Sequence, residues 1–222
     1  MTLLWDVRWL LLQATFTTAK LFVLSALLAL VIAFLVGAAR TSSHKWLSGA
    51  ALVFGEVFRG ISLVVQLFWI FFVLPLFGVS LSATTAAVLA LGICFGAYGS
   101  EVVRAALVSV PDGQRQAAFA VGLSPLLTLI LVVMPQAFAT MIPPFGNLAV
   151  LLLKSTSVTA LITIPELAFT ASALNSNLGA SLAVFGYVLA AYYLMGRVVL
   201  SGTNWLEHRV AFWRNAGARS TR

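Results

Sequence analysis

The sequence has little charge, and negative charge is the scarcer kind. Only 9% of the 222 residues are charged, with 6 Asp and Glu against 13 Lys and Arg, while 61% are hydrophobic. A soluble domain carries roughly a quarter charged residues. The shortage of charge therefore argues against a soluble globular fold.

Groups that carry chemistry in enzymes are also scarce. The single cysteine, Cys94, lies in an apolar run, and one cysteine can form neither an internal disulfide nor a cysteine-based metal site. His44 and His208 stand far apart without ligand spacing. No GxxxxGKS or GxxxxGKT nucleotide-binding motif occurs, so any ATP hydrolysis must come from a partner. We therefore expect a non-catalytic protein with no cofactor and no metal.

Long apolar runs are what the sequence has in abundance. Residues 21–39 contain no charge, and about 20 apolar residues are enough for a helix to cross a bilayer. The sequence predicts an all-α integral membrane protein, organised as a single domain over residues 1–222, with five transmembrane helices. They lie near residues 18–39, 58–77, 83–107, 126–153 and 179–200.

The basic residues divide unequally between the two sides of these runs. Ten of the thirteen fall on one side, in the segments after the first and third runs and in the C-terminal tail. They are Arg40, Lys45, Arg59, Arg104, Arg115, Arg197, Arg209, Arg214, Arg219 and Arg222. Because Lys and Arg accumulate on the cytoplasmic side, we predict an N-out, C-in, multi-pass protein. The net charge of +7 is then a matter of orientation in membrane lipid, and no nucleic acid partner is expected.

Two of the predicted spans contain residues that disturb a membrane helix. Gln66 lies within the second span, where its amide either hydrogen-bonds a neighbouring helix or lines a polar path. The pair Pro143–Pro144 predicts a kink or break in the fourth span. Asn147 follows that pair, and either binds a polar solute together with freed carbonyls or only satisfies the broken backbone.

Charged residues near the spans allow a structural or a functional role. Glu166 follows Pro165 in a polar stretch, and it either contacts a substrate ammonium or lies on an exposed outer-surface helix. The pair Glu101 and Arg104, and likewise Glu56 and Arg59, are three residues apart. Local ion pairs at the membrane edge are favoured for both pairs over a gating role.

The segment after the third span, SVPDGQRQAAFAVGLSP, predicts a short helix over residues 111–122. Pro111 suits a first helical position, and Gly122 suits a C-terminal cap. A helix face of small side chains is formed at spacings i, i+3, i+4 and i+7 by Gln114, Ala117, Ala118 and Val121. Such a face either docks into a groove of another protein or lies on lipid.

Several motifs in this region resemble one family. Gln116-Ala117-Ala118, Gly122, Val132 and Met134-Pro135 resemble the EAA signature of ABC-importer permeases at its usual spacing. The flanking sequence and the blocks at residues 56–68, 151–162 and 165–167 resemble the polar amino-acid branch, which imports histidine, glutamine, glutamate or arginine. The resemblance runs collinearly over residues 15–205.

The resemblance implies a function and partners. The helix at 111–122 would be a cytoplasmic coupling helix seated in an ATP-binding subunit, of which two copies are expected. Its coupling residues would be Asp112, Gly113, Gln114, Gln116, Ala117, Ala118, Val121 and Gly122. A second permease subunit, identical or homologous, and a periplasmic or lipid-anchored solute-binding protein would complete an importer in the bacterial inner membrane. Its substrates would be polar amino acids or zwitterionic derivatives such as ectoine, moving along a path that includes Gln66, Asn147 and Glu166.

The sequence departs from the family pattern at two positions. Gln116 stands where the signature usually has Glu, and Ser62 where Pro is common. The alternative function is a self-sufficient channel or secondary transporter for a small polar solute. It is disfavoured because five spans leave no inverted repeat and because a docking helix would then have no purpose.

Overall fold

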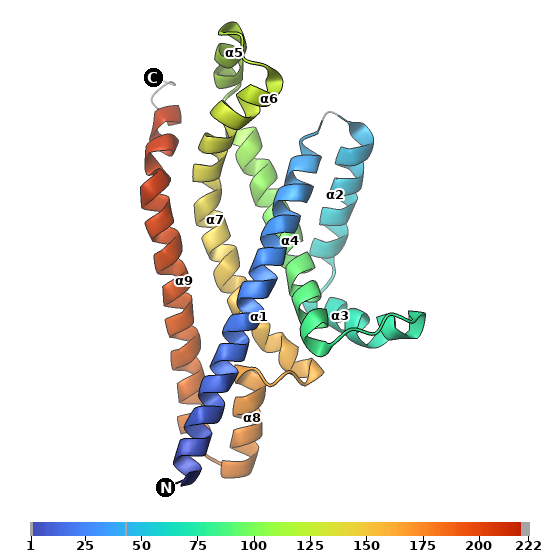
Figure 1. Cartoon of the computed structure of the whole chain (residues 1–222), viewed down its shortest axis with the longest axis vertical. Coiled ribbons are helices and arrows are strands. Elements are labelled where there is room, and N and C mark those ends of the chain that lie inside the picture. Colours follow the sequence, from blue (N-terminus) through green and yellow to red (C-terminus); the bar gives the residue numbers. More distant parts are fainter. Residues whose placement is uncertain (1, 43, 219–222) are drawn as a thin grey trace.

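The computed structural model describes residues 2–42 and 44–218, and this part of the chain is helical with no strand (Figure 1). The four longest helices are α1 (Thr2–Arg40), α4 (Ala83–Ser109), α7 (Met134–Ser155) and α9 (Ser181–Ala218). The shorter elements are α2 (Lys45–Gly60), α3 (Leu63–Phe68), η1 (Trp69–Val73), η2 (Leu74–Phe77), α5 (Asp112–Ala120), α6 (Pro125–Thr128), η3 (Leu129–Val133), η4 (Thr156–Ile162) and α8 (Leu167–Leu178). The all-α prediction is confirmed.

Four helical segments of the described chain are long and apolar enough to cross a membrane. They are Val7–Arg40, Ala83–Ser109, Pro125–Ile162 and Ser181–Val210. Each overlaps one predicted span, and each extends beyond the apolar run that predicted it. A run of apolar residues marks the part of a helix that lies in hydrocarbon, whereas the helix itself continues into the polar interface.

The second predicted span, residues 58–77, is wrong as a straight helix. Lys45–Gly60 and Leu63–Phe77 are separate segments that meet at 101°, and only as a bent pair do they make a fifth candidate span. Ile61 has φ −92° and ψ 136°, and Ser62 has φ −59° and ψ 136°. These two extended residues end α2 and turn the chain. The bend was missed because Ile61 and Ser62 lie near the start of a mostly apolar stretch whose only proline, Pro75, comes later.

At Pro143–Pro144, where a kink or break is predicted, the helix is not broken. Both prolines lie inside the continuous helix α7, and the irregular turn is instead the π-helical segment η3. Packing explains why the helix tolerates the missing N–H groups, since neighbouring helices restore much of the lost stability in a membrane. Met141, Ile142 and Gly146 are buried around the two prolines.

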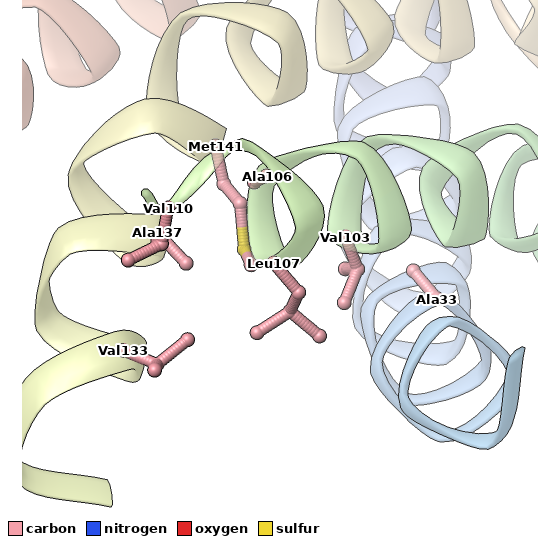
Figure 2. Packing of buried hydrophobic residues seen from close by; sticks show 8 residues of the cluster. All are labelled: Ala33, Val103, Ala106, Leu107, Val110, Val133, Ala137 and Met141. Atoms are coloured by element: carbon pink, nitrogen blue, oxygen red, sulfur yellow. The ribbon is translucent and has the colours of Figure 1, made fainter. Parts of the chain in front are cut away.

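Small residues bring α1 and α4 into close contact. A Cβ added to Gly96 would lie 2.7 Å from Ile32 Cβ, and one added to Gly37 would lie 2.6 Å from Val103 Cβ. Close approach through small residues is the usual means by which membrane helices associate. The apolar cluster in Figure 2 joins this pair to η3 and α7. Its buried members are Ala33, Val103, Ala106, Leu107, Val110, Val133, Ala137 and Met141.

The two ends of the molecule carry different elements (Figure 1). One end holds α5, α6, the connection between α1 and α2, and the C-terminal end of α9. The opposite end holds α8 and the N-terminal end of α1. Three residues of the predicted basic side belong to the α5 end, because Arg40 ends α1, Lys45 begins α2 and Arg115 lies in α5. Arg59 lies at the other end of α2 and Arg197 lies within α9, while Arg219 and Arg222 lie outside the described residues. The N-out, C-in orientation itself stays a prediction.

Candidate coupling and transport site

The predicted helix at 111–122 is present as α5, with Pro111 as its N-cap residue. After it, Gly122 has φ +82°, a left-handed conformation that glycine adopts without steric cost. The Gly122 N–H donates to the Phe119 carbonyl at 3.0 Å, and the Leu123 N–H donates to the Ala118 carbonyl at 3.1 Å. The predicted glycine cap is therefore confirmed, and it turns the chain from α5 into α6.

The predicted docking face of α5 divides into two parts. Ala118 is only 4% exposed, whereas Val121 is 77% exposed. Ala117 is exposed and Gln114 is half-buried. The prediction that these residues form one face toward a partner is wrong for Ala118, because η3 packs beside α5 and encloses that side of the helix.

The exposed surface of this segment includes a residue that the sequence pattern did not single out. Phe119 is 50% exposed and is the only aromatic residue of α5. We define the α5 outer surface by its exposed residues Asp112, Gly113, Gln116, Ala117, Phe119 and Val121. An exposed aromatic among small residues is typical of an anchor that fills a partner's pocket. In the sequence, the one sign of this role was a large aromatic side chain among small ones.

Gln66 is buried at the bend between α2 and α3. Its side-chain Nε2 donates to the carbonyl of Phe58 at 2.8 Å and to that of Ile61 at 3.3 Å. These carbonyls lie where α2 ends, so they lack intrahelical donors. This bond joins two consecutive helices inside the predicted second span, so the amide stabilises the bend.

Glu166 is fully buried, with 0% exposure. As the N-cap of α8, its Oε1 accepts from the Phe169 N–H at 2.8 Å. Its Oε2 accepts from the Tyr192 hydroxyl at 3.2 Å and from Thr18 Oγ1 at 3.5 Å. Burial raises the pKa of the Glu166 carboxyl above its ordinary value, and these hydrogen bonds offset only part of that rise. The prediction of an exposed outer-surface helix is wrong for this residue, and the carboxylate faces no open surface of the chain.

Asn147 lies on an exposed stripe of α7, although the break on which its prediction rested is absent. Exposed residues recur at spacings of three and four along one side of this helix. They are Thr140, Pro144, Asn147, Leu151 and Lys154. Three of these five side chains are polar, and polar groups are costly when they face lipid in a membrane span. The stripe is therefore suited to a polar path or to a partner rather than to lipid.

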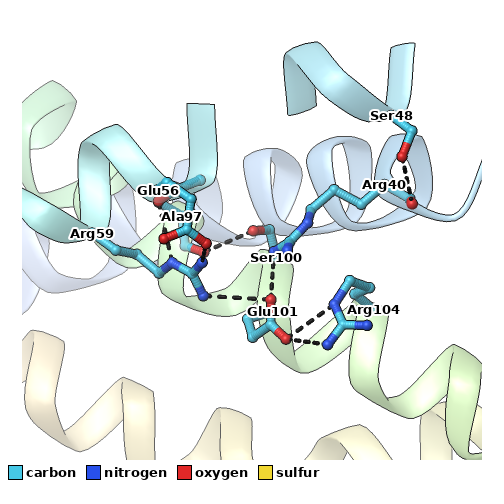
Figure 3. A network of polar contacts seen from close by, with 9 residues as sticks. Arg40, Ser48, Glu56, Arg59, Ala97, Ser100, Glu101 and Arg104 are labelled. Atoms are coloured by element: carbon cyan, nitrogen blue, oxygen red, sulfur yellow. Dashed lines mark hydrogen bonds and ion pairs between the residues drawn. The ribbon is translucent and has the colours of Figure 1, made fainter. Parts of the chain in front are cut away.

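Three arginines from α1, α2 and α4 converge on one carboxylate, that of Glu101 (Figure 3). Arg59 Nη1 lies 3.4 Å from Glu101 Oε2, and Arg104 Nε donates to Glu101 Oε1 at 3.0 Å. Arg40, 61 residues before Glu101, forms the third ion pair, and Glu56 pairs with Arg59. The two predicted local pairs are confirmed. The convergence was missed because sequence spacing gives no sign of a contact between α1 and α4.

Metal-ligating groups are not assembled in the described part of the chain. No group of three or more His, Cys, Asp or Glu residues is placed to hold a metal ion there. The geometry is instead that of a multi-pass helical membrane protein with a short helix exposed at one end and a polar stripe along one span. This arrangement is that of a helical membrane protein, and comparison with known proteins identifies its class.

Residues 29–211 match the family described as binding-protein-dependent transport system inner membrane component, and the chain belongs to that family. It is 36% identical over 208 residues to the "Probable amino-acid ABC transporter permease protein y4tF" of Sinorhizobium fredii, covering 91% of this chain and 87% of the relative. It is also 36% identical over 203 residues to the glutamine transport system permease protein GlnP of Escherichia coli, covering 89% and 92%.

Solved structures share the fold. The crystal structure of an amino acid ABC transporter with histidines matches with a TM-score of 0.85 and 28% identity, covering 93% of this chain and 96% of that chain. An inward-facing structure of the MetNI methionine ABC transporter matches with a TM-score of 0.80 and 19% identity, covering 92% and 98%. At the lower identity the likeness concerns the fold alone.

Proposed function

We propose that this chain is the permease subunit of an ATP-driven importer for polar amino acids or zwitterionic derivatives such as ectoine. Family membership supports transport that depends on a binding protein. The names of the relatives support amino acids as the substrate class. The unequal division of Lys and Arg between the two sides of the apolar runs supports an N-out, C-in orientation in a bacterial inner membrane.

The observation that carries this proposal is the α5 outer surface. It combines exposed small residues with Phe119 and Val121 at one end of the bundle, where an ATP-binding subunit can form a groove around them. Two ATP-binding subunits, a second permease subunit (identical or homologous) and a periplasmic or lipid-anchored solute-binding protein complete the importer. The permease is then a two-state element, biased by ATP on one side and by the loaded solute-binding protein on the other.

The exposed stripe of α7 supports a location for the path. Asn147 offers an amide that can both donate to a carboxylate and accept from an ammonium group. Gln66 and Glu166 are engaged within the chain by the bonds described above. We therefore assign Asn147 to the path, and assign to Gln66 and Glu166 a structural role in stabilising the helices around it.

The test is uptake by the reconstituted complex in vesicles. The chain is purified under mild detergent with the ATP-binding subunit, and labelled polar amino acids are supplied with the solute-binding protein. We expect uptake that requires both ATP and the solute-binding protein. Uptake by the chain alone, without ATP, would instead support the alternative of a self-sufficient channel or secondary transporter.

A further inference from the structure

The side chain of Arg115 reaches from α5 to the end of α4. Its Nη2 donates to the Leu107 carbonyl at 2.9 Å, across eight residues of sequence. The last four carbonyls of a helix have no partner within the helix, and a cation near them is favoured by the helix dipole. Arg115 therefore satisfies an acceptor of the last turn of α4 and places a positive charge at its negative end.

The same side chain is enclosed rather than free at the surface. Arg115 Nε is buried without a hydrogen-bond partner among the described residues. Burying the Nε donor without a partner costs free energy. The hydrogen bond from Nη2 to the Leu107 carbonyl offsets that cost and stabilises the buried position of the guanidinium. The Arg115 guanidinium thus links α5, a short helix at one end of the molecule, to the long helix α4.

The receiving end of this contact is firmly packed. Leu107 and Val110 are each 5% exposed and belong to the cluster with Val133, Ala137 and Met141 (Figure 2). A force applied to the Leu107 carbonyl is therefore applied to a buried junction of α4, η3 and α7. Packed cores of this kind move as units rather than deforming locally.

The backbone between the two helices is a weak connection by comparison. Val110 has φ −71° and ψ 122°, and Pro111 has φ −57° and ψ 138°, so no helical hydrogen bonding continues across them. Without the arginine, the first turn of α5 would be joined directly to α4 only by two extended residues, while its other support comes from η3, which packs beside α5. Such a joint permits rotation of α5 while α4 stays still.

We propose that Arg115 is a positioning residue that makes α5 and the end of α4 move together, so that motion of the ATP-binding subunit reaches the membrane helices. This inference rests on the proposed function, because it needs a partner bound to α5. Arg115 is half-buried and lies outside the α5 outer surface. Its loss should therefore leave docking intact and impair transmission.

The experiment uses the full complex in vesicles with the solute-binding protein. Arg115→Ala removes the bond, Arg115→Lys keeps a donor and a charge, and Lys45→Ala removes an exposed charge at the same end as a matched control. The measurements are recovery of the ATP-binding subunit, thermal stability, and the number of solute molecules imported per ATP hydrolysed.

We expect Arg115→Ala to retain the ATP-binding subunit and to hydrolyse ATP, while solute imported per ATP falls about tenfold, as for the loss of a charge-assisted hydrogen bond. Arg115→Lys should recover most of the loss, and Lys45→Ala should behave like the wild type. Normal coupling in Arg115→Ala, detachment of the ATP-binding subunit, or no recovery in Arg115→Lys would overturn the inference. A wild-type complex without stimulated hydrolysis would instead refute the proposed function.

Discussion

Among single residues, Arg40 is the most deeply buried member of the cluster around Glu101. Its side chain is 8% exposed, against 35% for Arg104 and 33% for Glu101 itself. Removing a buried member of an ion-pair cluster costs more than removing an exposed one, although Glu101 keeps two arginines in either case. The three arginines are therefore unequal, although each contacts the same carboxylate.

Arg40→Ala should lower the free energy of unfolding by about 1–3 kcal/mol, which is below the range for fully buried pairs because Glu101 is partly exposed. Arg104→Ala should cost about 1 kcal/mol or less. Thermal unfolding in detergent measures both variants. Equal losses would contradict the inference that burial ranks the arginines.

Glu166 allows the structural and the transport role of a carboxylate to be separated. Glu166→Ala removes the N-cap of α8 and should lower stability by about 0.5–2 kcal/mol. Glu166→Gln keeps an oxygen that can accept from the Phe169 N–H, but its NH2 group cannot accept from the Tyr192 and Thr18 hydroxyls. Stability should therefore fall less than in Glu166→Ala, and uptake should stay close to wild type. If the Gln variant is stable but does not transport, the negative charge itself acts on the solute.

At the scale of elements, the contact between α1 and α4 depends on glycine. Ala is the better helix former by about 1 kcal/mol, so Gly→Ala is stabilising wherever space allows. A Cβ at Gly37 would lie 2.8 Å from the Ser100 carbonyl oxygen, which belongs to rigid backbone. Gly186 on α9 has no neighbouring atom within 4 Å of the same position.

Gly37→Ala should therefore destabilise the chain by about 1–3 kcal/mol through overpacking. Gly186→Ala, the matched control, should leave stability unchanged or raise it by up to about 1 kcal/mol. The opposite signs are measured by unfolding in the same detergent. A loss of stability in Gly186→Ala as large as that in Gly37→Ala would show that the close contact is not the cause.

The division of α5 predicts two different consequences for the same new charge. Phe119→Asp places a carboxylate on the α5 outer surface, where it should detach the ATP-binding subunit by charging a desolvated contact while the chain stays folded. Ala118→Asp places it inside this chain and should lower the stability of the permease itself. Subunit recovery and thermal stability distinguish the two, and reversed outcomes would contradict the assignment of the faces.

The helices were predictable from sequence to different degrees. The α5 segment was well predicted because its start and end carry local signals, Pro111 and Gly122. The bend at Ile61 and Ser62 was not predictable, because its stabilising bond from Gln66 joins residues whose separation carries no pattern. The continuity of α7 through Pro143 depends on burial by other helices, which a local rule for proline cannot include.

The candidate site divides in the same way. Periodicity located the α5 surface but could not tell which side the rest of the chain would cover, so Ala118 was misassigned and Phe119 was missed. Glu166 was noted as an ionisable group beside the membrane spans, yet its partners Thr18 and Tyr192 come from the two ends of the chain. Contacts between distant residues decide the role of such a group.

For the whole molecule, the sidedness of the basic residues remains to be measured. A reporter active only in the periplasm should be active when fused after Phe77 and silent when fused after Arg222, because the basic residues gather on the C-terminal side. The bent pair α2–α3 makes this a test of the crossing count as well. The reverse pattern, or activity of both fusions, would rule out five crossings with the N-terminus outside.

The close packing of α1 on α4 also bears on how the chain assembles during synthesis. The close contacts at Gly37, Gly92 and Gly96 and the ion pairs of Glu101 involve only residues up to Arg104. The first half can therefore associate in the membrane before α7 and α9 have left the ribosome. The second half then packs against the N-terminal part of α1. There the Tyr187 hydroxyl lies 3.3 Å from Thr15 Oγ1, and the Leu167 N–H donates to Thr18 Oγ1. A nascent chain halted before α8 would hold the first half in place and leave the N-terminal part of α1 without these contacts.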